Sequence, residues 1–192
     1  MNTLLMLMAV ALCSAAKSTV PCQCPNIQDI ILNDPDFEKF RDPFPFLTSR
    51  SRLYLVPLED QFDGIECVTS ELKEKHDGNR RVDRTVFWKE SGSSKRKSKE
   101  VPMFMMDVPI GRSPRSNFTT FAFTNIGIVF ETVYTDRRCL IFRTIDENDG
   151  KRTECFFWVK EWFLGSPLRD CRFIVNLFCE KGYGVKSPEK CE

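Results

Sequence analysis

Cysteine and histidine are the residues of this sequence whose number and spacing bear most directly on its chemistry. The 192-residue chain contains nine Cys and one His, His76. So many cysteines in a short chain are typical of an oxidising compartment, unless they bind a metal. A single histidine and the absence of any C-x-x-C pair argue against a structural zinc site. We therefore expect disulfides and no metal.

A catalytic centre is not indicated by the remaining reactive residues. Nucleophilic catalysis needs a base beside a Ser or Cys. His76 stands in the turn-like sequence His76-Asp77-Gly78-Asn79, where we expect it to be exposed, and no G-x-S-x-G or phosphate-binding loop occurs. The sequence therefore favours a binding protein without a cofactor over a secreted hydrolase.

The charge balance is close to neutral. Lys and Arg number 28 against 27 Asp and Glu, which gives a net charge of +1, and 42% of the residues are apolar. This composition is that of a soluble globular protein and argues against nucleic acid or a membrane as partner. The basic residues Lys95, Arg96, Lys97 and Lys99 are expected to form a solvated hairpin loop, with an anionic surface as the alternative contact.

The amino terminus has the features of a secretory signal peptide. Residues 1–16 carry no charged side chain, Leu4 to Leu12 form a short apolar run, and Ser14 and Ala16 fit a cleavage site. The run is too short to span a bilayer. Cleavage would remove Cys13, leave eight cysteines, and release residues 17–192 as one secreted, extracellular domain. Asn117 begins the sequon Asn117-Phe118-Thr119 and is a candidate glycosylation site.

Short β-strands separated by polar turns are predicted between residues 49 and 162. No helix follows a strand until the end of this region, so an antiparallel meander is favoured over a parallel α/β sheet. Helical turns are predicted over 26–41, broken near Pro35 and stopped by Asp42-Pro43-Phe44-Pro45, and again over 168–182. The predicted strands are 52–58, 65–75, 81–90, 100–108, 117–123, 127–135, 139–145 and 154–162.

Eight such strands can form a sandwich or a closed up-and-down barrel, and the cysteine spacing favours a barrel. Cys171 and Cys179 share one face of the last helix because they are eight residues apart. If that helix packs outside the barrel, the two cysteines can bridge to Cys139 and Cys155 on the outer face of the strands. A direct Cys139–Cys155 bridge across their hairpin is the alternative. In the first arrangement the residues that point inward are Leu140, Phe142, Phe156 and Trp158.

These features resemble the tick salivary lipocalins of the histamine-binding type. The resemblance runs from about residue 29 to 192, and its clearest elements are Leu53-Tyr54-Leu55-Val56, Glu66-Cys67-Val68, Tyr134 to Cys139 and Glu154 to Trp158. It implies an all-β, eight-stranded antiparallel lipocalin barrel with an N-terminal helix and a C-terminal helix packed outside. It also implies the disulfides Cys67–Cys191, Cys139–Cys171 and Cys155–Cys179, and leaves Cys22 and Cys24 without a counterpart.

The resemblance further implies a function, namely the capture of a small host mediator to suppress host defence. Family ligands include histamine and serotonin, and in some members leukotrienes or other lipids, while some members bind host proteins. A buried cationic amine needs carboxylates beside it, and aromatic faces add cation–π attraction. A lipid needs an apolar tube with a polar group at its mouth.

Residue by residue, the resemblance supports an amine site only in part. Glu100 stands where the histamine binders place one interior acid. Two other expected acids are Leu140 and Phe156 here, and Phe130 replaces a polar residue. Glu131 faces the opposite side of its strand from Phe130, and we do not count it among the ligand residues. A hydrophobic ligand is thus at least as well supported as an amine.

We expect the ligand-binding residues to lie inside a monomeric barrel. An interior filled by the same side chains is the alternative, and the protein would then be a scaffold that binds a host defence protein through its loops. The candidate ligand-binding residues are Trp88, Glu100, Phe118, Phe130, Leu140, Phe142, Phe156 and Trp158.

Overall fold

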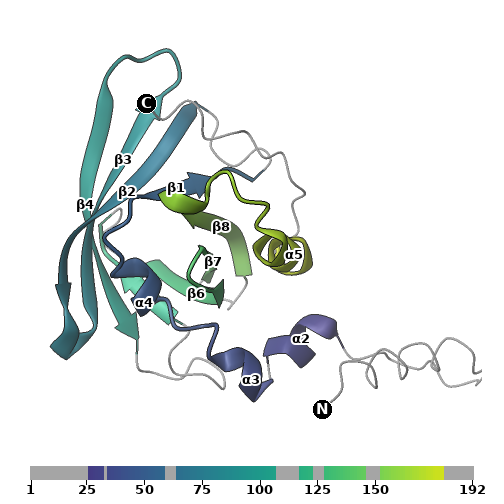
Figure 1. The fold of residues 1–192 in the computed structure, drawn as a ribbon. Helices are drawn as coiled ribbons and strands as arrows, with labels where there is room; N and C mark the ends of the chain where they lie inside the picture. Colours follow the sequence, from purple (N-terminus) through teal and green to yellow (C-terminus); the bar gives the residue numbers. More distant parts are fainter. Residues whose placement is uncertain are drawn as a thin grey trace, which may run out of the picture.

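The protein is an eight-stranded antiparallel barrel, as the sequence predicts. The computed structural model describes residues 26–32, 34–58, 64–106, 117–122, 128–145 and 152–179. The strands follow one another around the barrel in chain order, and β8 pairs with β1 to close it (Figure 1). They are β1 (Leu53–Val56), β2 (Ile65–His76), β3 (Arg81–Glu90), β4 (Arg96–Met106), β5 (Asn117–Thr120), β6 (Ile128–Thr135), β7 (Cys139–Ile145) and β8 (Arg152–Lys160).

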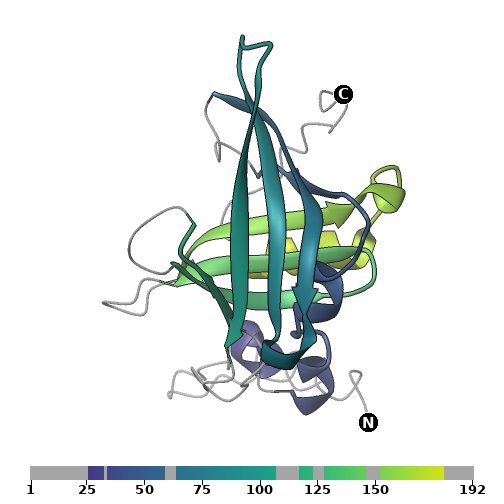
Figure 2. The same ribbon diagram turned by 90° about the vertical axis from the view of Figure 1, so that its left-hand side faces the viewer.

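The strands β2, β3 and β4 are the longest and form one wall of the barrel. In Figure 2 they stand side by side in front of β6, β7 and β8, which cross behind them. β4 begins at Arg96, so Arg96, Lys97 and Lys99 lie in a strand and the prediction of a basic loop is wrong for them. The cause is pairing with β3, because Lys97 lies opposite Trp88 and Lys99 opposite Val86.

The last helix, α5 (Arg169–Phe178), packs outside the barrel against β6 and β7 (Figure 1). Its buried face is formed by Cys171, Ile174, Val175 and Phe178, which recur at helical spacing. Disulfides join Cys139 to Cys171 and Cys155 to Cys179. The predicted outer helix and both of its disulfides are therefore confirmed.

The strand register excludes the direct bridge across the β7–β8 hairpin. Cys139 lies opposite Val159 and Cys155 opposite Arg143, so the two cysteines are not cross-strand partners. Cys67 is disulfide-bonded as well. Its predicted partner Cys191 lies outside the described residues, as do Cys22, Cys24 and the predicted signal peptide 1–16.

The helical turns before the barrel cover its outer side and one of its ends. α2 (Ile27–Leu32) and α3 (Pro35–Glu38) are separated near Pro35 as predicted, and the Asp34 carboxylate caps α3 by accepting from the Asp36 amide at 2.8 Å. A further turn, α4 (Phe44–Leu47), forms in the segment that was predicted to stop the helix. It can form because its prolines lie at the first positions, where a helix needs no N–H donor.

Two hydrophobic clusters result, one inside the barrel and one outside. The inner cluster joins Phe46 and Leu47 of α4 to inward side chains of the strands, among them Val82, Phe118 and Leu140. The outer cluster lies between β6–β8 and α5 and holds the cysteines of the two disulfides that join α5 to the barrel. None of the helices that the structure describes is long and apolar enough to cross a membrane.

Candidate ligand-binding site

The barrel encloses a cavity of about 380 Å³. This volume falls in the range of small-molecule sites, roughly 300–1,000 Å³. The barrel is therefore not filled by its own side chains. Six of the eight candidate residues from the sequence lie on its wall, namely Trp88, Phe118, Phe130, Phe142, Phe156 and Trp158.

Four phenylalanines form a continuous aromatic wall in the cavity. Phe118 stacks on Phe130 with ring centroids 5.0 Å apart, and Phe142 stacks on Phe156 at 5.1 Å. The two pairs meet edge to face, with Phe130 and Phe142 5.2 Å apart. Such packed rings hold one another in place and present a rigid apolar surface to a ligand.

The closed end of the cavity is built around a buried arginine. Arg84 on β3 lines the cavity, is 0% exposed, and donates five hydrogen bonds. Its guanidinium donates to the hydroxyl and carbonyl of Ser70 and to the carbonyls of Leu47, Ser49 and Ser51. Arg84 thus ties the α4 segment to the barrel, and burial lowers the pKa of its guanidinium to about 10.

All five N–H donors of Arg84 are used by neutral acceptors, since a guanidinium has five. A ligand carboxylate would have to displace one of these bonds. The charge itself still acts on the cavity, because a buried cation is weakly screened. Its field disfavours a second cation at this end.

The opposite end of the cavity is more polar. Lys160, the last residue of β8, lies at the α4 end, with its ammonium over the Phe46 ring. Glu154 comes six residues earlier on the same strand and is therefore far from the α4 end of the cavity. It is exposed, and it is the one carboxylate among the described residues that line the cavity. Thr144 lines the same end and its hydroxyl accepts from the Glu154 amide at 3.2 Å. The cavity is thus apolar along its length and acidic at one end.

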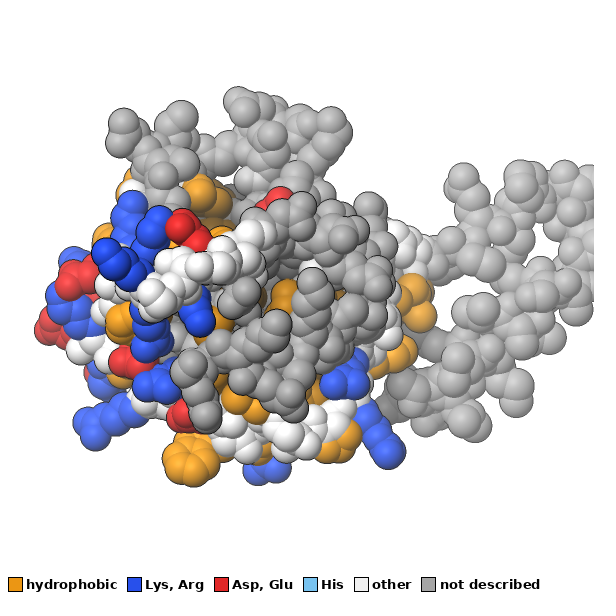
Figure 3. Space-filling view, turned by 90° about the horizontal axis from the view of Figure 1, so that it is seen from above, with side chains coloured by type: hydrophobic (Ala, Val, Ile, Leu, Met, Phe, Trp, Pro, Cys, Tyr) orange, Lys and Arg blue, Asp and Glu red, His pale blue; other side chains and the backbone are white. Residues whose placement is uncertain are grey.

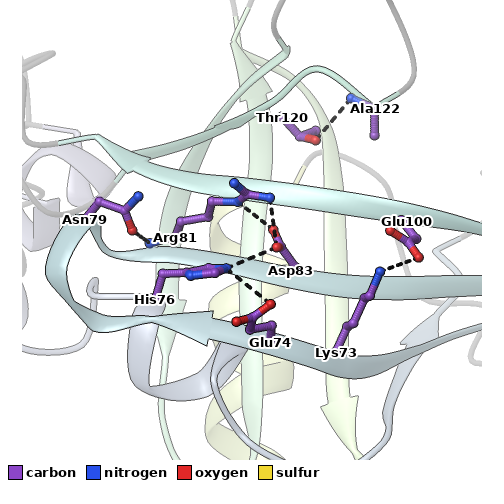
Figure 4. Close-up of polar contacts among 9 residues, drawn as sticks. All are labelled: Lys73, Glu74, His76, Asn79, Arg81, Asp83, Glu100, Thr120 and Ala122. Atoms are coloured by element: carbon purple, nitrogen blue, oxygen red, sulfur yellow. Dashed lines mark hydrogen bonds and ion pairs between the residues drawn. The ribbon is translucent and has the colours of Figure 1, made fainter.

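Glu100 lies outside the cavity, and its prediction as an interior acid is wrong. Its carboxylate forms an ion pair with Lys73 at 2.5 Å on the outer face of the β2–β4 wall (Figure 4). Val101 and Met103 on the same strand line the cavity, so alternation turns Glu100 outward. Lysine, arginine and acidic side chains gather together over this wall in Figure 3.

Leu140, a predicted ligand-binding residue, and Asn117, a predicted glycosylation site, are both buried. Leu140 points inward and is 0% exposed, but it packs in the inner cluster without lining the cavity. Asn117 is 1% exposed at the start of β5. Glycosylation of Asn117 stays a prediction.

Glu131 is buried outside the barrel and does not reach the cavity. Its carboxylate lies 3.3 Å from Arg41 and 2.7 Å from Arg143, and all three side chains are buried. This acid therefore stabilises the contact between the N-terminal segment and the β6–β7 surface.

His76 is less exposed than its turn-like sequence predicts. It is the last residue of β2, and its Nε2 lies 3.2 Å from Asp83 and 3.7 Å from Glu74 (Figure 4). Arg81 donates to both carboxylate oxygens of Asp83, at 2.7 and 2.8 Å. The Asp83 carboxylate is thus engaged by a guanidinium, and these residues form a charge cluster at the strand end.

Comparison with known proteins identifies the group to which this barrel belongs. The family described as tick histamine binding protein matches residues 32–191 of the chain. The chain belongs to the tick histamine-binding protein family. This membership makes it a ligand-binding lipocalin.

One solved structure supports the fold of this family member. Japanin from Rhipicephalus appendiculatus, bound to cholesterol, aligns with a TM-score of 0.51 at 13% identity, over 69% of this chain and 89% of that one. Lobster apocrustacyanin A1 aligns with a TM-score of 0.46 at 12% identity, over 79% of each chain. No curated protein matches the sequence.

The cavity of this tick lipocalin lacks the acids that its family resemblance implies. The corresponding positions carry Leu140 and Phe156, both turned inward. The residues that sequence analysis missed are Arg84 and Glu154. Both share strand parity with predicted wall residues, because Arg84 alternates with Val86 and Trp88, and Glu154 with Phe156.

Proposed function

We propose that the protein is a secreted, monomeric salivary lipocalin that sequesters a small, mainly apolar host mediator of the lipid type in its barrel. It acts by binding and carries out no reaction. Removal of the mediator from host tissue would reduce inflammation and defence. The observation that carries the proposal is the distribution of charge along the cavity, with Arg84 at the closed end and Glu154 at the other.

The aromatic and aliphatic wall supports an apolar ligand. Besides the four phenylalanines, the wall includes Leu53, Leu55, Val86, Val101 and Met103. Burial of apolar ligand surface against such a wall contributes about 25 cal/mol per Å² before the costs of association. Japanin, whose barrel aligns with this one, was solved with cholesterol, which is a ligand of this class.

The same charges argue against a histamine site deep in the barrel. A buried ammonium without a carboxylate beside it is very costly, and along the described wall the single carboxylate, Glu154, lies at the exposed end. The cation at the closed end raises that cost further. An amine could therefore be held only near Glu154, with its apolar part in the cavity.

Titration of the refolded mature protein tests this proposal. Calorimetry with cholesterol, a fatty acid, a leukotriene, serotonin and histamine should give saturable one-to-one binding for at least one lipid and none for histamine. Tight histamine binding with no lipid binding would overturn the assignment of ligand class. No binding across the whole panel would favour the protein-binding alternative.

A pair of variants on β3 separates binding in the cavity from binding on the surface. Val86 lines the cavity, whereas the adjacent Phe87 faces outward beneath the Arg96 guanidinium, 4.1 Å from it. Val86→Trp should fill part of the cavity and weaken lipid binding about tenfold or more, an effect of about 1.4 kcal/mol. Phe87→Trp adds a similar side chain outside the cavity and should leave the affinity unchanged. Equal affinities in the two variants would contradict a ligand inside the barrel.

A second candidate function, the binding of a host defence protein, is supported by two exposed aromatic residues. Trp162 is 81% exposed and Phe121 is 56% exposed. Large apolar side chains of this exposure are common at protein interfaces. Trp162→Ala and Phe121→Ala would lower the affinity for such a partner without changing lipid binding in the barrel.

A further inference from the structure

A second hollow lies outside the barrel, next to its closed end. It is a groove of about 1080 Å³ between the α3–α4 segment and the turn that joins β6 to β7. Aromatic residues form part of its lining, since Phe40 stacks on Tyr134 with ring centroids 5.6 Å apart. The groove shares Phe46 with the floor of the barrel but is separate from the ligand cavity.

Most of the acids in this groove are already neutralised. Asp136 accepts from Arg138 at 2.6 Å, and Arg138 also pairs with Asp170 at 2.8 Å. Asp42 accepts from Arg80 at 2.6 Å. Arg80 neutralises Asp42, while Arg138 neutralises only one of its two aspartates, so about one negative charge remains beside the groove.

Three cations that line the groove have no ion-pair partner among the described residues, namely Lys39, Arg137 and Lys160. Glu38 is the remaining acid of the lining, and it has a contact of its own. The four cations and three acids of the lining, with Arg80 and Asp170 as their ion-pair partners, give the groove a local charge of about +1. This positive charge attracts an anion such as a sulfate group or a phosphate monoester, and the phosphate monoester carries close to two negative charges at neutral pH.

Lys160 is the least exposed of the three cations. Its ammonium lies 5.0 Å from the centre of the Phe46 ring and is half-buried. Burial lowers the pKa of its amine, the charge of Asp136 opposes this shift, and the charge of Arg84 adds to it. A bound anion would stabilise the charged form of Lys160.

We propose that the groove at the closed end is a second binding site, which takes a small organic molecule through a phosphate or sulfate group held by Lys39, Arg137 and Lys160. The aromatic side chains Phe40 and Tyr134 provide an apolar surface for the rest of the molecule. This site is independent of the lipid cavity, and both can be filled at once.

Calorimetric titration with phenyl phosphate at low ionic strength tests the site, with inorganic phosphate and phenol in parallel. We expect saturable binding of phenyl phosphate, weaker binding of inorganic phosphate and none of phenol. Lys160→Met should weaken phenyl phosphate binding about tenfold or more, and Lys160→Arg should retain it. Salt at about 1 M should abolish it, because screening then acts over about 3 Å.

Lys97→Met is the matched control, since Lys97 is an exposed lysine paired with Glu90 on the distant β3–β4 hairpin. It should bind phenyl phosphate like the unaltered protein. Lipid binding in the barrel should be the same in every variant, which also shows that each is folded. Unchanged phosphate binding in Lys160→Met, or no saturable binding at all, would overturn the proposal. Inorganic phosphate binding as tightly as phenyl phosphate would support the anion site and identify the free ion as its occupant.

Discussion

Lys73 and Glu100 lie two strands apart on the outer wall, on β2 and β4, and their side chains meet across β3 with 2.5 Å between Nζ and Oε1. Both side chains are largely exposed, at 49% and 65%. Exposed pairs of this kind contribute little to stability, about 0–1 kcal/mol. The acid that the family resemblance assigned to the ligand is therefore a surface charge.

Glu100→Gln should leave ligand binding unchanged and alter the free energy of unfolding by less than about 1 kcal/mol. Glu154→Gln removes a carboxylate that does line the cavity. It should weaken the binding of any ligand that places an amine or hydroxyl at that end, and leave a purely apolar ligand unaffected. Titration of both variants with serotonin and a fatty acid checks this. A loss of affinity in Glu100→Gln alone would show that the ligand binds outside the barrel.

Arg84→Met should destabilise the protein strongly. The substitution leaves the carbonyls of Leu47, Ser49 and Ser51 without their donor, and each buried group left unpaired costs about 1–3 kcal/mol. We expect a total loss of about 3 kcal/mol in urea denaturation. Arg81→Met is the matched control, because Arg81 pairs with Asp83 at the surface, and it should cost about 1 kcal/mol or less. Equal losses in the two variants would contradict a specific role of Arg84 in closing the barrel.

Strand parity made much of the barrel interior predictable from the sequence. Alternation, together with the positions of the cysteines, predicts that Phe142, Phe156 and Trp158 point inward, and all three line the cavity. The same rule applied to Val101 and Met103 places Glu100 outside. The family position of Glu100 predicts an interior acid, whereas the apolar pattern of its own strand predicts the outward orientation that the structure shows.

Arg84 could not be identified from the sequence in the same way. A charged residue on a strand is usually exposed, and the acceptors that permit its burial come from residues 47–51, more than 30 positions away. A direct bridge would need Cys139 opposite Cys155, four residues from its observed partner Val159, and the one-residue register shift between Arg143 and Ile145 is too small to account for this difference. The pairing register is set by the turn and by the buried face of the whole sheet, so the spacing of the two cysteines alone does not reveal it.

Asp83→Asn should reduce the sensitivity of the protein to acid. Burial alone would raise the pKa of the Asp83 carboxyl, but the hydrogen bonds and charges of Arg81 and His76 outweigh this and lower it. A lowered native pKa gives stability that is present above the unfolded value near 4 and is lost as the pH falls through the native value. Urea denaturation from pH 7 to pH 2 should show a shallower decline of the free energy of unfolding for the variant. Parallel curves for the two proteins would contradict a native pKa shift at Asp83.

The three tryptophans should report separately on the cavity and on the surface. Trp88 and Trp158 line the cavity, whereas Trp162 is 81% exposed. Trp162→Phe should remove most of the fluorescence that acrylamide quenches in the free protein, and keep the change caused by an apolar ligand. The double variant Trp88→Phe with Trp158→Phe should lose the ligand-induced change and keep the quenching by acrylamide. A ligand signal that disappears in Trp162→Phe would place the ligand on the surface near the end of β8 and contradict binding inside the barrel.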